Sequence, residues 1–535
     1  MNPKDGKGKD NPRIEAAGGC PIRVRGVSRR QFLSGCAACA GAAGLGGAPS
    51  WIKSIPGVAG RDKLRIRIIY ALHAGVQDRP DWPNVGFDFR PVMERTTLEL
   101  VKRLPEFEFL PATATGPDEA QKLFEADKAA PADGFIVMQL NCWNRVAQTF
   151  AASGRPVLYA DFKYAGSGGF LVYTSGFLRA GAKNVGFAAS SRIEDLAAAA
   201  RCFKDASPGG PAYDFDAATA RVRIAATPRP SDLACLPDPL KTLSPQETVQ
   251  RMKASKILAV RDDKSGPETT LMGIPVVQVP FSVVNEAWAA ADKDEARAIA
   301  DRWLKTAARV EGVSREELIN SAAMYLGEKA VLKKYGANAI TINCLGGFYG
   351  GHIHAYPCLG FHELNNEGLV GGCECDVPSA SAMVAVGILS QGRPGYISDP
   401  VMDTANRRII YAHCVASNKA FGPSGATNPF EILTHSEDRQ GAAVRSLLPA
   451  GYMTTSVEVS EARKEILLHR AKAVGNDPDD RACRTKLVAE PVGDFEKLFR
   501  MWDVWGWHRV TFYGDLEGAV RGLADALGWT VVAEA

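Results

Sequence analysis

Hydrophobic positions after about residue 60 form short continuous runs separated by longer periodic stretches. The stretch at 64–72, the continuous apolar run at 134–140 and the short run at 156–160 predict strands, and the apolar spacing at 90–104 predicts a helix. Buried strands separated by helices are typical of a parallel sheet that is covered on both faces. The sequence therefore predicts a Rossmann-like α/β domain over residues 62–175.

The same pattern continues in a second unit. Runs at 221–225, 257–260 and 274–279 predict further strands, and together they predict a second Rossmann-like α/β domain over 176–365. The glycine-rich stretch at 166–169 lacks the third glycine of a dinucleotide-binding loop, so we interpret it as a linker or turn.

Two long helices are expected late in this second unit, at 285–309 and 314–335. The second helix carries its own boundaries in the sequence. Ser314 and Glu317 form a capping box that satisfies free amides at the start, and Gly336 supplies a left-handed residue at the end. These bounds are the sharpest that the sequence gives.

The pattern changes towards the carboxyl end. Short strand-like runs occur at 396–399, 408–414 and 452–457, with few helices between them. We expect a β-rich, largely antiparallel domain over 366–535. Within it, the stretch 461–471 is interpreted as a surface helix that carries His469.

Length and composition agree with a globular protein of several domains. The chain has 535 residues, 23% of them charged, and a net charge of +3. A chain of this length exceeds a single core, and this charge gives no reason to expect nucleic acid as a partner. Its 12 cysteines lack the paired spacing of a structural zinc site.

The first 50 residues resemble a twin-arginine export signal. Arg29 and Arg30 follow Ser28 and precede Phe32 and Leu33, and a weakly apolar run of Ala, Gly and Cys comes next. We expect cleavage near residue 48, export by the twin-arginine machinery and a periplasmic location. The run is too rich in Gly and Ala for a stable membrane span.

Candidate chemistry centres on two acids, Glu374 and Asp376, that follow an apolar approach at 369–373. If this segment is a strand, residues i and i+2 point to the same face, as a hard-metal site or a proton-transfer pair requires. Two acids at this spacing also occur on solvated strand faces. Both interpretations are open on the spacing alone.

Other candidates have two interpretations each. His352 and His354 lie in a glycine-rich loop, where they could bind a metal, contact a substrate or remain solvated. Asp399 could cap a turn or hydrogen-bond to metal ligands. His413, at the end of an apolar strand, could be a core residue or a sugar contact. His435, in a charged segment, is expected to be solvated.

The order of these motifs resembles a known family. From about residue 339 to the end, the chain is similar to the carboxyl-terminal half of L-fucose and L-arabinose isomerases, in the succession Pro357-Cys358, Glu374-x-Asp376, a helix, Asp399, His413-Cys414, His435 and Trp507-His508 before a strand and Gly514-Asp515. Before residue 339, the chain resembles these isomerases only in its α/β architecture.

This resemblance implies two α/β domains followed by a β-rich domain, assembled into a homo-oligomer. It also implies a divalent metal, usually Mn²⁺, held by Glu374 or Asp376 together with His508. The implied reaction converts a small uncharged aldose into a ketose through an enediol, with Glu374 and Asp376 as the candidate catalytic carboxylates.

One departure from the family pattern bears on activity. The family has a further functional Glu about two dozen residues before Glu374, where this chain has Gly350 to His354 instead, and Glu363 and Glu367 lie too near. His352 or His354 could replace it. The alternatives to an isomerase are a non-catalytic carbohydrate-binding protein and a metal-dependent epimerase, lyase or hydrolase.

Overall fold

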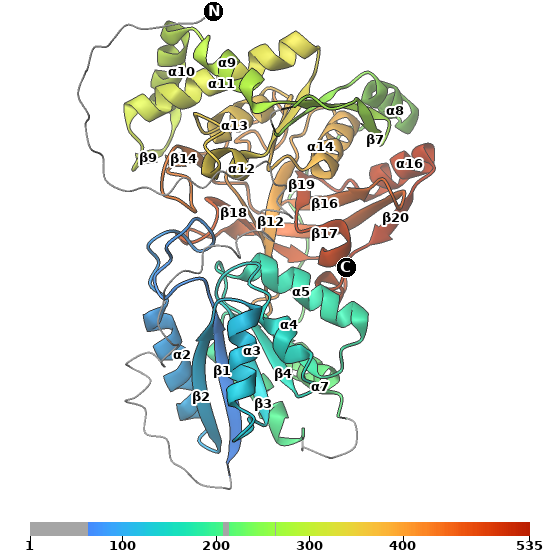
Figure 1. Cartoon of the computed structure of the whole chain (residues 1–535). Coiled ribbons are helices and arrows are strands. Elements are labelled where there is room, and N and C mark those ends of the chain that lie inside the picture. Colours follow the sequence, from blue (N-terminus) through green and yellow to red (C-terminus); the bar gives the residue numbers. More distant parts are fainter. Residues whose placement is uncertain (1–62, 207–212, 263) are drawn as a thin grey trace, which may run out of the picture.

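A computed structural model describes residues 63–206, 213–262 and 264–535 and contains two α/β domains with a β-rich domain between them (Figure 1). This architecture confirms the predicted fold class. The predicted twin-arginine segment at 1–50 lies outside the described residues. Within the described part, no helix has the length and apolar character needed to cross a membrane.

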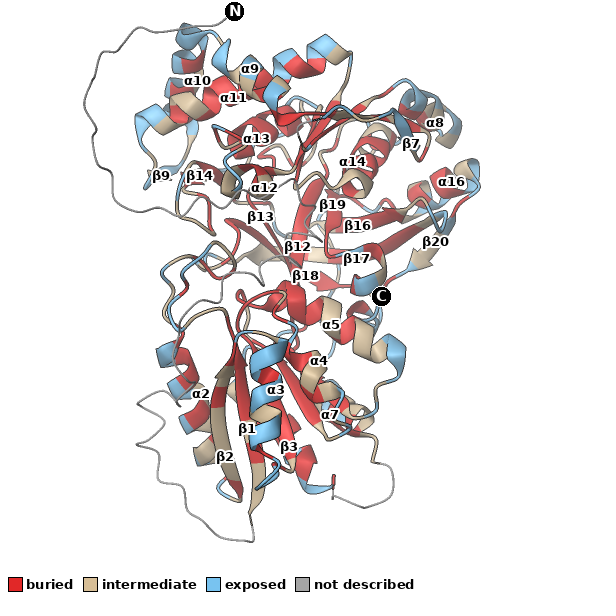
Figure 2. Ribbon diagram, viewed as in Figure 1, coloured by how far each residue is buried: buried red, intermediate tan, exposed pale blue. Residues whose placement is uncertain are grey.

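The first domain is built on five parallel strands in the order β2-β1-β3-β4-β5. The strands are β1 (Leu64–Ala71), β2 (Phe107–Ala114), β3 (Gly134–Gln139), β4 (Val157–Asp161) and β5 (Val185–Ala188). The helices are α2 (Arg90–Arg103), α3 (Pro117–Ala126), α4 (Val146–Ala151), α5 (Ser167–Ala180), α6 (Ile193–Ala200) and α7 (Phe215–Ala226). β3, β4 and β5 are buried along their whole lengths, which explains their continuous apolar sequences, whereas the edge strand β2 is largely intermediate, as its tan colour in Figure 2 shows. β5 and α7 follow the boundary expected at residue 175 and pack on this domain.

Two local predictions for this domain are wrong. The stretch 221–225 is not a strand but the last part of α7, whose start is capped by Asp214 accepting from the amide of Ala217. Arg223 is buried there and pairs with Glu496. The glycine-rich stretch at 166–169 starts α5 rather than forming a linker, and a Cβ at Gly168 would overlap the ring of Trp507. The absence of a side chain at Gly168 therefore allows α5 to pack closely against Trp507.

The second domain contains a five-stranded sheet in the order β11-β10-β6-β8-β7, parallel except for β7. Its strands are β6 (Ile257–Val260), β7 (Thr269–Leu271), β8 (Ile274–Val279), β10 (Ala339–Ile342) and β11 (Val370–Cys373), and β9 (Arg309–Glu311) lies apart from them. Its helices are α8 (Pro245–Lys253), α9 (Phe281–Ala289), α10 (Lys293–Thr306), α11 (Arg315–Tyr335), α12 (Cys344–Tyr349), α13 (Cys358–Asn366) and α14 (Val377–Leu389).

The helix at 314–335 is confirmed as α11, since Ser314 accepts from the amide of Glu317 and Gly336 has a φ of 58°. The single helix expected over 285–309 is instead two helices, α9 and α10, because Asp292 caps a new start by accepting from the amides of Asp294 and Glu295. The expected loop after β10 contains the short helix α12.

The third domain is a closed antiparallel barrel. Its strands run in the order β16-β19-β12-β13-β18-β17, and β17 pairs back with β16. They are β12 (Tyr396–Asp403), β13 (Arg408–His413), β16 (Met453–Ser460), β17 (Glu465–Asn476), β18 (Thr485–Pro491) and β19 (Arg509–Tyr513), with β20 (Thr530–Ala533) added to β17. A small sheet joins β9 to β14 (Phe430–Leu433) and β15 (Ala443–Ser446), and the helices here are α15 (Trp502–Trp505) and α16 (Glu517–Leu527).

The predicted surface helix at 461–471 is wrong. His469 lies in β17 with 2% of its surface exposed. Its Nδ1 lies 2.7 Å from Glu534, and its Nε2 lies 2.6 Å from the hydroxyl of Tyr411 on β13. Since β13 and β17 are not neighbours in the barrel, the contact with Tyr411 crosses the barrel interior, which explains why a polar residue is buried at this position of β17.

Both α/β domains contact the barrel. On one side, Trp507 packs against Trp82 and Trp143 of the first domain, with ring centroids 5.4 and 5.5 Å apart. On the other side, α14 of the second domain packs on β16 and β12. The barrel therefore contacts the first domain through Trp507 and the second domain through α14.

Candidate metal centre

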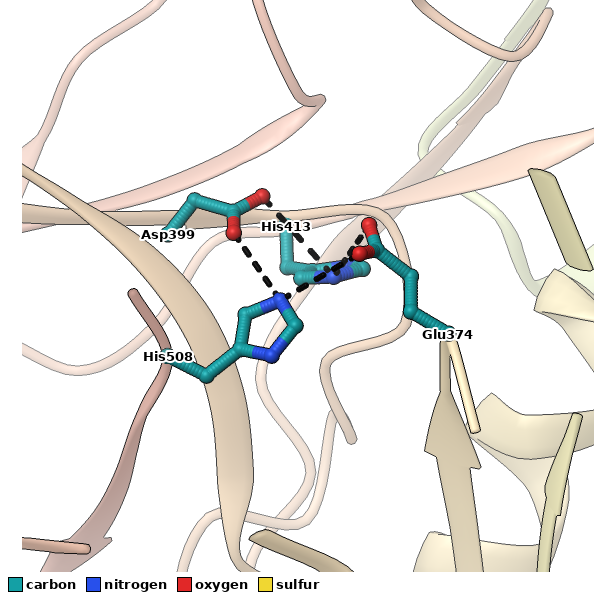
Figure 3. A group of neighbouring side chains, drawn as sticks. All are labelled: Glu374, Asp399, His413 and His508. Carbon is teal, nitrogen blue, oxygen red and sulfur yellow. Dashed lines mark ion pairs between the residues drawn. The ribbon is translucent and has the colours of Figure 1, made fainter. Parts of the chain in front are cut away.

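Four side chains that are far apart in the sequence meet in one group, Glu374, Asp399, His413 and His508 (Figure 3). One potential ligand atom from each lies within 4.8 Å of the others. Glu374 follows β11 of the second domain, whereas the other three come from the barrel. The group therefore lies where the second α/β domain meets the barrel.

Strand register brings the barrel residues together. β12 lies between β19 and β13, with Ser398 opposite Arg509 and Asp399 opposite Ala412. His508 immediately precedes β19, and His413 is the last residue of β13. Adjacent antiparallel strands thus place one acid between two imidazoles.

Glu374 reaches the group from a tight turn. β11 ends at Cys373, and both Glu374 and Cys375 have left-handed backbone conformations, with φ of 61° and 52°. The predicted strand alternation of Glu374 and Asp376 is therefore wrong, because the strand has already ended. Two successive non-glycine residues in this region cost about 1–2 kcal/mol each, so the surrounding packing must hold the turn in place.

Asp376 uses both of its oxygens. Oδ1 accepts from the amide of Ser379 and caps the start of α14, at 2.9 Å. Oδ2 lies 2.8 Å from Nδ1 of His508. A proton on Nδ1 satisfies this contact and leaves Nε2 facing the other carboxylates.

His508 is enclosed by acids. Its Nε2 lies 3.0 Å from Oδ1 of Asp399 and 3.5 Å from Oε2 of Glu374. Burial by itself would lower the pKa of His508, but the charge of Asp399 and the hydrogen bond to Asp376 raise that pKa to about 9. The carboxylates of Asp399 and Glu374 therefore favour a positive charge next to Nε2 of His508.

His413 is held differently. Its Nδ1 accepts a hydrogen bond from the amide of Cys414 at 2.9 Å. In the neutral ring the proton is then on Nε2, which lies 3.8 Å from Glu374 and 3.9 Å from Asp399. His413 is thus oriented to donate a hydrogen bond.

The distances around Nε2 of His508 fit a shared divalent ion. Two ligands about 2.1 Å from an ion are roughly 3.0 Å apart at a right angle and roughly 3.4 Å apart at the tetrahedral angle. The separations of 3.0 and 3.5 Å match these values. Two carboxylates and one imidazole suit a hard or borderline divalent metal. Glu374, Asp399 and His508 could therefore hold a metal ion.

Comparison with known proteins gives one relevant similarity. The chain is 27% identical over 118 residues to a sulfoquinovose isomerase from Alkalicoccus urumqiensis. The chain is thus distantly similar to a sugar isomerase. The matched region covers 22% of this chain and 26% of the relative's length. No protein-family model matches the sequence. The similarity agrees with an isomerase-like family and does not distinguish the fucose or arabinose type.

The remaining predicted residues lie elsewhere. His352 stacks on Phe281 with ring centroids 5.7 Å apart, and the exposed His354 packs near Trp288. Neither belongs to the four-residue group. The expectation that His435 is solvated is wrong, because it is 5% exposed and its Nδ1 lies 3.1 Å from Asp438.

The family resemblance implied a further acid upstream of Glu374, at a position where this chain has none. Asp399, which lies downstream, places a second carboxylate beside Glu374. The sequence signal was an acid in the strand-like run at 396–399, and the structure shows that all eight residues of β12 are buried. An acid inside a fully buried strand needs a charged partner or a metal. Its position downstream of Glu374 put it outside the segment in which an acid was expected.

Proposed function

We propose that this chain is a metal-dependent sugar isomerase that interconverts an aldose and a ketose through an enediol. The observation that carries the proposal is the arrangement around His508, whose Nε2 faces the carboxylates of Glu374 and Asp399 while Asp376 holds Nδ1. The distant similarity to a sugar isomerase supports the same reaction class.

In this proposal Glu374, Asp399 and His508 hold the ion. A divalent ion held there would supply Lewis-acid polarisation of the sugar. Asp376 positions His508, since a ligating histidine commonly donates its other ring N–H to a carboxylate. Asp376, a candidate ligand and catalytic acid from the sequence, is therefore assigned to positioning, because both its oxygens are already engaged.

Proton transfer is assigned to Glu374. Its carboxylate would take the proton from the carbon next to the carbonyl and return it to the neighbouring carbon, as the enediol mechanism requires. The left-handed turn aims this side chain from the second domain at the three barrel residues. His413 would donate a hydrogen bond from Nε2–H to a sugar oxygen and keep its proton, in agreement with the orientation fixed by the amide of Cys414.

Four finer features belong to the same proposal. An uncharged sugar is the proposed substrate, because a net charge of +3 over 535 residues gives no reason to expect a phosphate-binding site. Mn²⁺ is the proposed metal, because an oxygen-rich site with one imidazole suits it. A homo-oligomer and periplasmic location after twin-arginine export, from Arg29 and Arg30, complete the proposal.

The test is to incubate metal-loaded protein with a panel of free aldoses in heavy water and to follow the sugars by NMR. An isomerase yields the ketose with deuterium at carbon. Glu374→Gln should abolish ketose formation, whereas Glu367→Gln, at an exposed position on the same domain, should preserve it. Cleavage of the sugar, or binding without exchange, would contradict the proposal.

The alternatives give different products in this experiment. An epimerase exchanges deuterium and returns an aldose, a lyase or hydrolase cleaves, and a carbohydrate-binding protein does neither. The non-catalytic alternative was based on the absence of the functional Glu that the family has upstream of Glu374. Asp399 now offers a second carboxylate beside Glu374, which favours the catalytic proposal.

A further inference from the structure

Two cysteines lie in contact directly behind the turn that carries Glu374. Sγ of Cys344 is 3.0 Å from Sγ of Cys373. Cys344 is the first residue of α12, and Cys373 is the last residue of β11. Both are buried, with 1% and 4% of their surfaces exposed. Neighbouring strands of the second sheet, β10 and β11, place them side by side.

This contact is close to the geometry of a covalent bond. A disulfide has an S–S length of about 2.0 Å, so bond formation requires only about 1 Å of further approach. A soft-metal site is the other common use of paired thiols, but it needs further ligands. In the described part of the chain, neither cysteine belongs to a group of three or more potential metal ligands.

We propose that Cys344 and Cys373 form an intramolecular disulfide that fixes the turn bearing Glu374. Cys373 immediately precedes Glu374, whose backbone and that of Cys375 are both left-handed. Two backbone hydrogen bonds tie the turn to the sheet, from the amide of Cys375 to the carbonyl of Ile342 at 2.9 Å and from the amide of Asp376 to the carbonyl of Cys373 at 3.4 Å. A covalent link at residue 373 would restrict the opening of this turn.

The bond can form with a small peroxide as the oxidant. The thiolate of one cysteine attacks a peroxide oxygen, the O–O bond breaks, and the oxygen is first held as a sulfenic acid while one water leaves. The second thiol attacks that sulfur, the S–S bond forms, and a second water leaves. Two thiols lose two electrons and two protons, and one hydrogen peroxide becomes two waters.

Peptide mapping tests the pairing directly. The reduced full-length protein is treated with hydrogen peroxide, unfolded, alkylated and digested with trypsin and a glutamate-specific protease. Cleavage at Lys334, Glu363, Glu367 and Glu374 puts Cys344 and Cys373 on separate peptides, 335–363 and 368–374. We expect these two peptides to be joined and to be two hydrogens lighter than the sum of the separate thiol peptides.

Cys358 shares the first peptide with Cys344, so variants complete the assignment. Cys344→Ala should abolish the cross-link, whereas Cys358→Ala and Cys202→Ala should retain it. Recovery of Cys373 as an alkylated thiol, or a link that survives Cys344→Ala, would overturn the proposal. The mapping needs no activity, so it is independent of the proposed isomerase function.

Amide hydrogen exchange tests the consequence for the turn. In the oxidised wild-type protein, exchange at residues 374–376 should slow by roughly tenfold relative to the reduced protein. The midpoint temperature of unfolding should rise by roughly 5 °C, since the bond closes a long loop in the unfolded chain. Cys202→Ala should show both shifts, and Cys373→Ala should show neither. Equal exchange in both redox states of a cross-linked protein would refute the role in fixing the turn.

Discussion

Nδ1 of His508 lies 2.8 Å from Oδ2 of Asp376, so the acid that starts a helix of one domain orients an imidazole of another. The same Asp376 carboxylate caps α14 through the amide of Ser379. The position of the candidate metal ligand is therefore coupled to the start of this helix. Changes at Asp376 can separate the two roles, because they need different properties of the side chain.

Asp376→Asn should keep the helix cap and weaken the metal site. Asparagine caps helices about as well as aspartate, so the contribution of the cap to the free energy of unfolding should change by less than about 0.5 kcal/mol. Loss of the negative charge behind His508 should lower metal affinity by roughly 10–100-fold. Titration calorimetry measures the affinity and denaturant unfolding the stability.

Asp376→Ala is the matched variant for this test. It should weaken metal binding to a similar degree and also destabilise the protein by about 1 kcal/mol through loss of the cap. Wild-type metal affinity in both variants would contradict the orienting role of Asp376.

His413→Gln should retain the metal and reduce turnover. Nδ1 of His413 accepts from the amide of Cys414, which leaves a neutral Nε2–H as a donor and not as a ligand. We expect full metal content and a kcat lowered by roughly 10–100-fold, measured by elemental analysis and by ketose formation.

His508→Gln is the comparison for His413→Gln, and it should lose most of the metal under the same conditions. His354→Ala, at an exposed position outside the group, should change neither quantity. Loss of metal from His413→Gln as large as that from His508→Gln would show that both imidazoles are ligands.

Much of the fold could be predicted from the sequence, because its local signals agree with its packing. The capping box at Ser314 and the closing Gly336 fix α11, and continuous apolar runs give the buried strands of both parallel sheets. The prediction for 221–225 failed because this stretch alternates as a strand would, whereas it continues a helix that starts at the Asp214 cap and buries Arg223 against Glu496.

The candidate site was predictable in part. The family resemblance paired His508 with Glu374 or Asp376, and in the structure both acids lie close to His508. The conformation of Glu374 could not be read from the sequence, since left-handed φ values at Glu374 and Cys375 depend on tertiary packing. The position of His469 inside the barrel also depends on a partner, Glu534, that lies far along the chain.

The stability of the protein should fall in alkaline solution through His435. Burial opposes its charge, but the hydrogen bond to Asp438 and the neighbouring Cys414 and Glu437 raise the pKa of His435 to about 9 from a usual value of 6.5. Its contribution is therefore fully present below about pH 6.5 and is lost as the pH rises through about 9. The loss should reach about 3 kcal/mol.

Denaturant unfolding of the metal-free protein between about pH 6 and pH 10 measures this effect of His435. His435→Gln should show a flatter dependence over this range, and the difference between wild type and variant isolates this residue. Asp438→Asn should flatten it as well, because the partner charge is removed. Parallel curves for wild type and His435→Gln would contradict the assignment.

Glu534 should be a main determinant of both barrel stability and the position of His508. Its carboxylate is fully buried and lies 2.6 Å from Nη2 of Arg509 and 2.7 Å from Nδ1 of His469. Burial opposes its charge, yet Arg509 and His469 lower the pKa of Glu534 to about 2. The guanidinium of Arg509 in turn donates to the carbonyl of His508 at 2.7 Å.

Glu534→Gln leaves the charge of Arg509 buried without its counterion, and we expect a loss of about 3–5 kcal/mol in the free energy of unfolding. Because the pKa is lowered, the stabilisation is present above about pH 4.5 and falls as the pH drops towards 2. Metal affinity should also fall, but less than in Asp376→Asn, since the main chain of His508 shifts while its imidazole keeps its partner.

Glu517→Gln, which breaks a surface pair with Arg521, should cost less than about 1 kcal/mol and leave metal binding unchanged. Equal effects of the two substitutions on unfolding would exclude the buried network as a major source of stability.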